Sequence, residues 1–249
     1  MVEPLQDSEL AIAPDQIIPL LQRYGLLPQL VREFLIDRAI APITLTEEES
    51  LKGYEQFYQR QQLKTEEDLQ NWMAARGLTR DQLEYLITRD FKLEQFKHQT
   101  WEKQLESYFL QRKTLLDRVI YSLIRVKSFD LAQELYFRIQ EGEQAFSDLA
   151  REYSQGAEAQ TGGLIGPVEL SVPHPALAKL LANSQPGQLL PPTRLMDWVV
   201  LARLESFLPA TLDDAMRQRL LNELFETWLQ QQMQQEGGRL MQQVVMGTL

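Results

Sequence analysis

The 249-residue chain contains no cysteine, which excludes disulfides, thiolate metal sites and cysteine nucleophiles. Histidine is almost as scarce, because His98 and His174 are the only two. Two separated histidines do not make a metal site, so we expect neither a metal nor any other cofactor. His98 lies among charged residues, and His174 precedes a proline at a predicted helix start. Both are interpreted as exposed side chains rather than catalytic bases.

Long hydrophobic runs and an excess of positive charge are also missing. No segment approaches the roughly 18 apolar residues of a membrane span, and the N-terminus is acidic where a secretory signal is basic. The 35 acidic and 25 basic residues give a net charge of -10, which repels nucleic-acid phosphates. We therefore expect a soluble, cytoplasmic protein without a nucleic-acid partner. Its 44% of hydrophobic residues can fill one large or two small cores.

Residues 1–116 carry apolar side chains at spacings of three and four without any strand pattern, which predicts an all-helical N-terminal domain. Helix starts are marked by three capping boxes: Thr46 with Glu49, Thr65 with Asp68, and Thr79 with Gln82. The last box opens a helix that runs to about Leu116 and is about 55 Å long at ~1.5 Å per residue. Such a rod needs a further segment to cover its apolar face.

The pattern changes in residues 117–209. Val119–Val126 and Trp198–Leu204 are rich in β-branched and aliphatic residues and predict two buried strands. Helical spacing returns over 129–139, 146–153 and 174–181, and a glycine-rich loop occupies 155–166. This segment therefore predicts a compact α+β domain with a small mixed or antiparallel sheet.

Residues 210–249 form the third predicted segment. Thr211 and Asp214 are placed to cap a long helix that continues to about Met233, ahead of a flexible Gly237–Gly238 pair. One apolar stripe runs along this helix, formed by Leu220, Leu221, Leu224, Phe225 and Trp228.

Several motifs in the middle segment follow one another in a characteristic order. They are Val126-Lys127-Ser128, Phe146-Ser-Asp-Leu-Ala-Arg-Glu-Tyr-Ser154, Gly162-Gly-Leu-Ile-Gly166, Pro175-Ala-Leu177 and Trp198 at the last strand. In this order the segment resembles the parvulin family of peptidyl-prolyl cis-trans isomerases, or rotamases. With its helical flanks, the chain is also similar to the SurA and PrsA group of foldase chaperones. The resemblance implies that the C-terminal helix packs back on residues 1–116 and that the partners are unfolded or proline-containing polypeptides.

The sequence departs from the parvulin family where the chemistry lies. The resemblance implies a site with two histidines, an Asp or Cys, and a Met/Phe pocket for proline. The polar positions fall on Leu123, Gly156 and Val199, and the pocket positions fall on Pro173 and Leu177. A shift of two residues in the first strand would instead place the Tyr121 hydroxyl in the groove, and this register stays open.

The expected peptide-binding groove consists of Tyr121, Leu123, Pro173, Leu177, Trp198 and Val199. Its floor is aliphatic and uncharged, so isomerase activity is predicted to be weak or lost while unfolded chain is still bound. The alternatives are an active isomerase or a non-catalytic adaptor that docks on a protein-export component. Each groove residue taken singly is also typical of sheet core. The negative net charge favours basic clients.

Overall fold

The computed structural model describes residues 12–247, which form two compact units. The sheet unit comprises residues 106–216, and the helical unit comprises the described residues on either side of it. Both unit boundaries lie inside helices, whereas the sequence places them at 116/117 and 209/210. The difference arises because the end of helix α5 is bonded to the sheet unit: the Ser171 amide donates to the Leu115 carbonyl, and the Ala210 amide donates to Asp117 Oδ1 at 2.7 Å.

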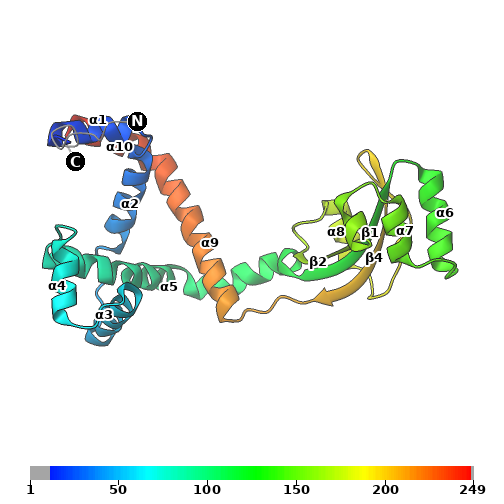
Figure 1. Cartoon of the computed structure of the whole chain (residues 1–249), viewed down its shortest axis with the longest axis horizontal. Coiled ribbons are helices and arrows are strands. Elements are labelled where there is room, and N and C mark those ends of the chain that lie inside the picture. The colour runs from blue at the N-terminus through cyan, green and yellow to red at the C-terminus, as the bar shows by residue number, and fades with distance from the viewer. Residues whose placement is uncertain (1–11, 248–249) are drawn as a thin grey trace, which may run out of the picture. The chain divides into compact units, whose positions relative to one another are not determined.

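The helical unit consists of short and long helices from both ends of the chain (Figure 1). Its elements are η2 (Pro14–Gln16), α1 (Ile17–Arg23), α2 (Leu27–Ile40), α3 (Glu47–Gln61), α4 (Glu66–Ala74), most of α5 (Arg80–Leu116), most of α9 (Asp214–Gln232), the π-helical turn η4 (Met233–Gly237) and α10 (Gly238–Met246). All three predicted capping boxes form. The short side chain of Asp68 accepts from the amides of both Lys64 and Thr65 at 2.9 Å.

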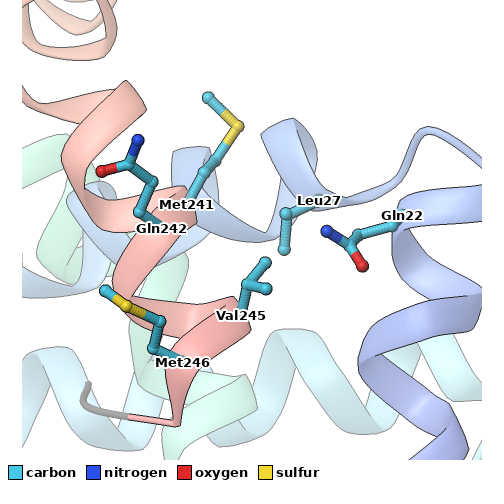
Figure 2. Close-up of a pocket in the computed structure, with 6 residues that line it drawn as sticks. All are labelled: Gln22, Leu27, Met241, Gln242, Val245 and Met246. Carbon is cyan, nitrogen blue, oxygen red and sulfur yellow. The ribbon is translucent and has the colours of Figure 1, made fainter.

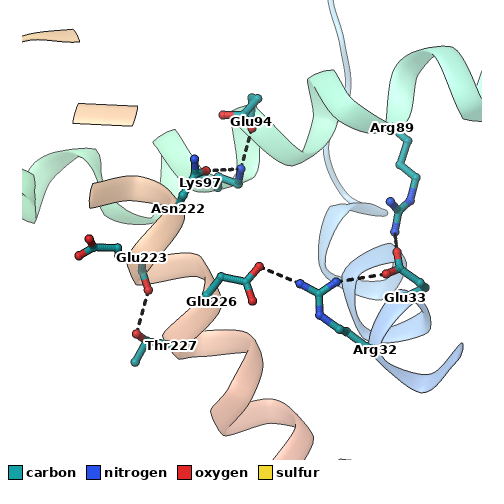
Figure 3. Close-up of polar contacts among 9 residues, drawn as sticks. All are labelled: Arg32, Glu33, Arg89, Glu94, Lys97, Asn222, Glu223, Glu226 and Thr227. Carbon is teal, nitrogen blue, oxygen red and sulfur yellow. Dashed lines mark hydrogen bonds and ion pairs between the residues drawn. The ribbon is translucent and has the colours of Figure 1, made fainter. Parts of the chain in front are cut away.

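Helix α9 covers the apolar face of α5. Phe225 and Trp228 of α9 meet Phe96 and Trp101 of α5, with ring centroids 5.3 Å apart for Phe96 and Trp228. The buried Lys97 ammonium donates to Glu94 and, at 2.7 Å, to Asn222 of α9 (Figure 3).

Helix α2 is held to the same two helices by charged side chains. Arg32 pairs with Glu226 of α9 at 2.7 Å, and Glu33 receives Arg89 of α5 at 2.6 Å (Figure 3). The helical lobe is thus completed by the C-terminal helix, as the resemblance implies.

Two expectations about the C-terminal helix are wrong. Its cap is Asp213 instead of Thr211, because the Met216 amide donates to Asp213 Oδ1 at 2.8 Å. Gly237 and Gly238 do not interrupt it, since both have helical backbone angles and the chain continues into α10. Packing outweighs the low helix propensity of glycine here, because Leu240 is buried and the Arg38–Glu236 ion pair ties this region to α2.

Helix α10 also borders a cavity of about 340 Å³ with α1 and α2. Its lining residues are Gln22, Leu27, Met241, Gln242, Val245 and Met246 (Figure 2). None of them is titratable, so this cavity offers no acid, base or charge for catalysis.

The sheet unit is a four-stranded antiparallel sheet with helices on both faces (Figure 1). Its elements are β1 (Arg118–Val126), α6 (Phe129–Gln140), α7 (Phe146–Tyr153), η3 (Ala157–Thr161), β2 (Leu164–Glu169), α8 (Pro175–Ala182), β3 (Thr193–Leu195) and β4 (Trp198–Leu208), and the strand order is β2-β1-β4-β3. The predicted α+β class is confirmed, and of the two sheet types left open the antiparallel one is present. Strands β2 and β3 were not predicted from the sequence.

Alternation of side chains along β1 and β4 divides the core of this unit in two. Ile124, Val126, Val199 and Leu201 pack with residues of α6 and α7. Tyr121, Leu123, Val200 and Ala202 pack on the opposite face with residues of α8. None of the helices between residues 12 and 247 combines the length and the apolar character that a membrane span requires.

Candidate functional site: a groove on the α8 face of the sheet

A cavity of about 320 Å³ lies on the α8 face of the sheet. It is lined by Tyr121, Leu123, Arg125, Ile165, Pro173, His174, Leu177, Leu195, Met196, Trp198 and Val200. Strand β1 contributes every second residue, as a strand that presents one face must. The structure therefore brings together five of the six residues predicted from the sequence, and we call this cavity the groove.

Val199 is the predicted groove residue that the structure places elsewhere. It pairs with Val126 across the sheet and packs in the core beside α6 and α7. Because neighbouring side chains of a strand point to opposite faces, Trp198 and Val200 are the β4 residues that line the groove. Leu123 and Val199 thus lie on different faces of the sheet.

The sequence left open whether Leu123 or Tyr121 of the first strand faces the groove, and the structure shows that both do. Tyr121 and Leu123 lie two residues apart on β1, and both line the groove. The Tyr121 hydroxyl makes no hydrogen bond to another residue between 12 and 247, and burial and the nearby Glu158 carboxylate raise the pKa of this phenol. It is therefore a neutral hydrogen-bond donor at neutral pH.

The expectation of an uncharged floor is wrong. Arg125 lines the groove, and its Nε donates to the buried Glu158 carboxylate at 3.1 Å, with a second bond from Nη2. The Ser154 hydroxyl donates to the same carboxylate at 2.7 Å and accepts the Arg125 amide at 3.0 Å. Sequence reasoning missed this pair because its members lie 33 positions apart and no motif links them.

The ion pair holds both groups charged. Burial acts to raise the pKa of Glu158, but the hydrogen bonds from Arg125 and Ser154 outweigh it, so the pKa of the carboxyl lies below its ordinary value. The bond to Glu158 raises the pKa of Arg125 in turn. The guanidinium is thereby fixed and its charge is balanced.

Gly156, where the resemblance places an Asp or Cys, lies against this ion pair. A Cβ atom there would lie 2.1 Å from Arg125 Nη2 and 2.2 Å from Glu158 Oε2. The pair therefore occupies the space that a side chain at position 156 would need.

The rim of the groove carries three further features. The His174 Nδ1 accepts the Ala176 amide at 3.3 Å, so this residue caps α8 as the sequence suggests. The Lys127 ammonium lies 3.7 Å from the centre of the Trp198 ring. Met196, in the turn between β3 and β4, is 81% exposed and has a left-handed φ of 55°, which is costly for a residue with a side chain.

The glycine-rich turn shapes the adjoining edge of the sheet. Gly163 has a φ of +86°, and a Cβ there would lie 2.8 Å from the Leu123 carbonyl oxygen. The Gly163 carbonyl accepts the Leu123 amide at 2.9 Å. Only glycine allows this approach, so the predicted structural role of the turn is confirmed.

Residues 125–205 match the family model of rotamases, described as the PPIC-type PPIase domain. This part of the chain is a parvulin-type domain, and it contains every groove residue except Tyr121 and Leu123. No curated protein matches the sequence significantly.

Several solved structures are similar to the chain. PrsA from Bacillus cereus is 19% identical, covers 96% of this chain and 88% of its own, and has a TM-score of 0.44. A structure from the study of the SurA-like chaperones PEB4 and Cj1289 of Campylobacter jejuni is 17% identical over 86% of this chain and 92% of its own, with a TM-score of 0.37. The parvulin domain of PpiD from E. coli is 26% identical over 39% of this chain and 95% of its own, with a TM-score of 0.34.

Proposed function

We propose that this chain is a parvulin-type foldase or chaperone that binds extended or unfolded polypeptide in the groove, with weak isomerase activity. The observation that carries the proposal is the groove itself, which lies on the parvulin-type domain and is walled by Leu123, Leu177 and Trp198. A mostly apolar cavity of about 320 Å³ suits a prolyl ring and its neighbours. A few polar groups, led by the Tyr121 hydroxyl, are available to orient the backbone.

Weak activity follows from the polar groups that the groove offers. Amide rotation faces a barrier of about 18–20 kcal/mol, and an enzyme must bind the twisted amide better than the planar forms. The Arg125 guanidinium uses two of its five N–H donors on Glu158, which balances its charge, so the Tyr121 hydroxyl is an uncharged donor for the amide. One neutral hydrogen bond contributes about 0.5–1.5 kcal/mol, or about tenfold in rate at most.

A fully active isomerase is the second candidate, and the donor groups of Tyr121 and Arg125 in the groove favour it. A protease-free assay of prolyl isomerisation on the whole protein separates the two. We expect little acceleration of an Xaa-Pro tetrapeptide, reduced further by Tyr121→Phe. Turnover comparable to that of ordinary parvulins in the natural protein, and loss of this turnover in Tyr121→Phe, would favour the active isomerase.

Client binding is tested separately with a permanently unfolded, proline-containing polypeptide. Met196→Ser removes an exposed apolar side chain from the groove rim and should weaken binding. Phe129→Ser removes a side chain that is 44% exposed at the start of α6, outside the groove, and should not. Equal affinities of the two variants would count against the groove as the client site.

The charge preference of the groove differs from that of the whole chain. Lys127 and Arg125 both lie over the Trp198 ring, and because Glu158 balances Arg125, the net charge beside that ring is the cation of Lys127. Electrostatic recognition is short-ranged at physiological salt, with a screening length of about 8 Å. We therefore expect no preference for basic clients at the groove. Docking on an export component and a cytoplasmic location stay predictions.

A further inference from the structure

A second apolar cavity, of about 400 Å³, lies beside α8 and the end of α5. It is lined by Thr114, Leu115, Leu170, Ser171, Pro173, Pro175, Ala178, Lys179, Ala182 and Asn183. Leu170 and Ala178 are buried in its floor, whereas Leu115 is 52% exposed at its edge. We call this cavity the α8 cavity.

The α8 cavity and the groove share one lining residue. Pro173 lines both, and along α8 the neighbouring residues Leu177 and Ala178 serve the groove and the α8 cavity respectively. Pro173 and Pro175 have rings of fixed φ and no amide donor, so the ridge between the cavities is rigid and lacks two backbone hydrogen-bond donors. The two cavities therefore lie on either side of Pro173, close enough for one extended chain to occupy both.

The charge of the α8 cavity limits what it can hold. Lys179 is exposed, and its ammonium makes no ion pair or hydrogen bond with another residue between 12 and 247. None of the lining residues is acidic, and the remaining polar ones are Thr114, Ser171 and Asn183. The cavity thus presents an apolar floor and one unpaired cation.

We propose that the α8 cavity is a second anchor site for the same client, taking a large apolar side chain with a carboxylate next to it. The proposal rests on the proposed function of the groove. A helix with its side chains is about 10–12 Å across, and an extended chain advances about 3.3 Å per residue. Leu177 and Ala178 are neighbours on α8, so the path between the cavities is no longer than the width of the helix, and the apolar anchor lies within about four residues of the proline.

Fluorescence anisotropy on the whole protein tests this proposal with labelled peptides. The short peptide carries one proline among alanines. Two longer peptides add Leu-Asp four residues before or four residues after that proline. We expect one of the longer peptides to bind about tenfold more tightly or better, since it buries an additional leucine.

Two variants locate the gain. Ala182→Glu places a charge in the cavity wall, and Lys179→Glu reverses the unpaired cation. Ala182→Glu should abolish the advantage of the longer peptide, Lys179→Glu should reduce it, and both should leave the affinity of the short peptide unchanged. The same peptide with Leu-Lys should regain its advantage on Lys179→Glu. Lys103→Glu makes the matched charge change on an exposed lysine of α5 outside the cavity and should have no effect.

Each other outcome contradicts the proposal in a distinct way. The short peptide could bind without any gain in affinity for either longer peptide, or the gain in affinity could survive both variants. Either result would show that the α8 cavity is not an anchor and would leave the groove as the client site. If no peptide binds, the proposed function fails and the second anchor fails with it. A dimer that Leu115→Ser dissociates would assign the cavity to a second copy of this chain.

Discussion

Replacing Arg125 by methionine tests the Arg125–Glu158 pair, the feature of the groove that the sequence did not reveal. The Glu158 side chain is only 3% exposed, and removal of its partner leaves the carboxylate buried with Ser154 as its remaining side-chain partner. Breaking a buried ion pair costs about 3–5 kcal/mol. Because Arg125 is 33% exposed, water reaches the site and we take the lower end, about 3 kcal/mol.

Amide hydrogen exchange measures this loss in the sheet unit alone. Ile124 and Leu201 are fully buried at the centre of the sheet, so their amides report its global opening. A loss of about 3 kcal/mol should speed their exchange by about 150-fold at neutral pH. The double variant with Arg125→Met and Glu158→Met should lose much less, since it leaves no buried charge. Amides of Leu220 and Leu221 in the helical unit provide the internal control.

The pH dependence gives the sharper test. The native pKa of Glu158 is lowered, so its stabilisation is present above the unfolded pKa and is lost as the pH falls through the native value. Without Arg125 the native pKa rises, and protonation relieves the buried charge. The difference in unfolding free energy between the variant and the natural protein should therefore shrink as the pH falls toward the ordinary carboxyl range. A gap of unchanged size, or no gap at neutral pH, would refute the role of the ion pair.

Three further predictions concern catalysis and architecture. Neither Leu123→His nor Val199→His alone should restore isomerase turnover, and a gain in turnover would contradict this. Val199→His should also lower the melting temperature, because Val199 is buried on the other face of the sheet. Gly163→Ala should destabilise the sheet unit in thermal unfolding, since its Cβ would meet the Leu123 carbonyl, and an unchanged melt would argue against that contact. Truncation before Thr211 removes four buried side chains of α9, worth about 6–12 kcal/mol, and should abolish the cooperative melt of the helical unit seen by circular dichroism.

Local signals made most of the fold predictable. The capping boxes and the helix spacing mark α3, α4 and α5, and the run from Val119 to Val126 marks β1. Strand β2 was missed because it begins inside the glycine-rich loop, where local composition favours a turn. Strand β3 has only three residues, too few to show a period.

The site was only partly predictable for a different reason. The groove residues on β1 and α8 follow from motif positions, but the face of Val199 depends on the pairing of β4, which spacing in the sequence does not determine. The Arg125–Glu158 pair depends on the tertiary fold, which brings η3 beside β1. The C-terminal helix shows the same effect, since packing on α2 keeps Gly237 and Gly238 helical.

Amide chemical-shift mapping during titration of the whole protein with an unfolded, proline-containing polypeptide tests the central claim most directly. If the groove holds the client, shifts should begin at Leu123, Leu177 and Trp198 and should be reduced in Met196→Ser. Shifts confined to the helical unit, or no response at millimolar peptide, would contradict it.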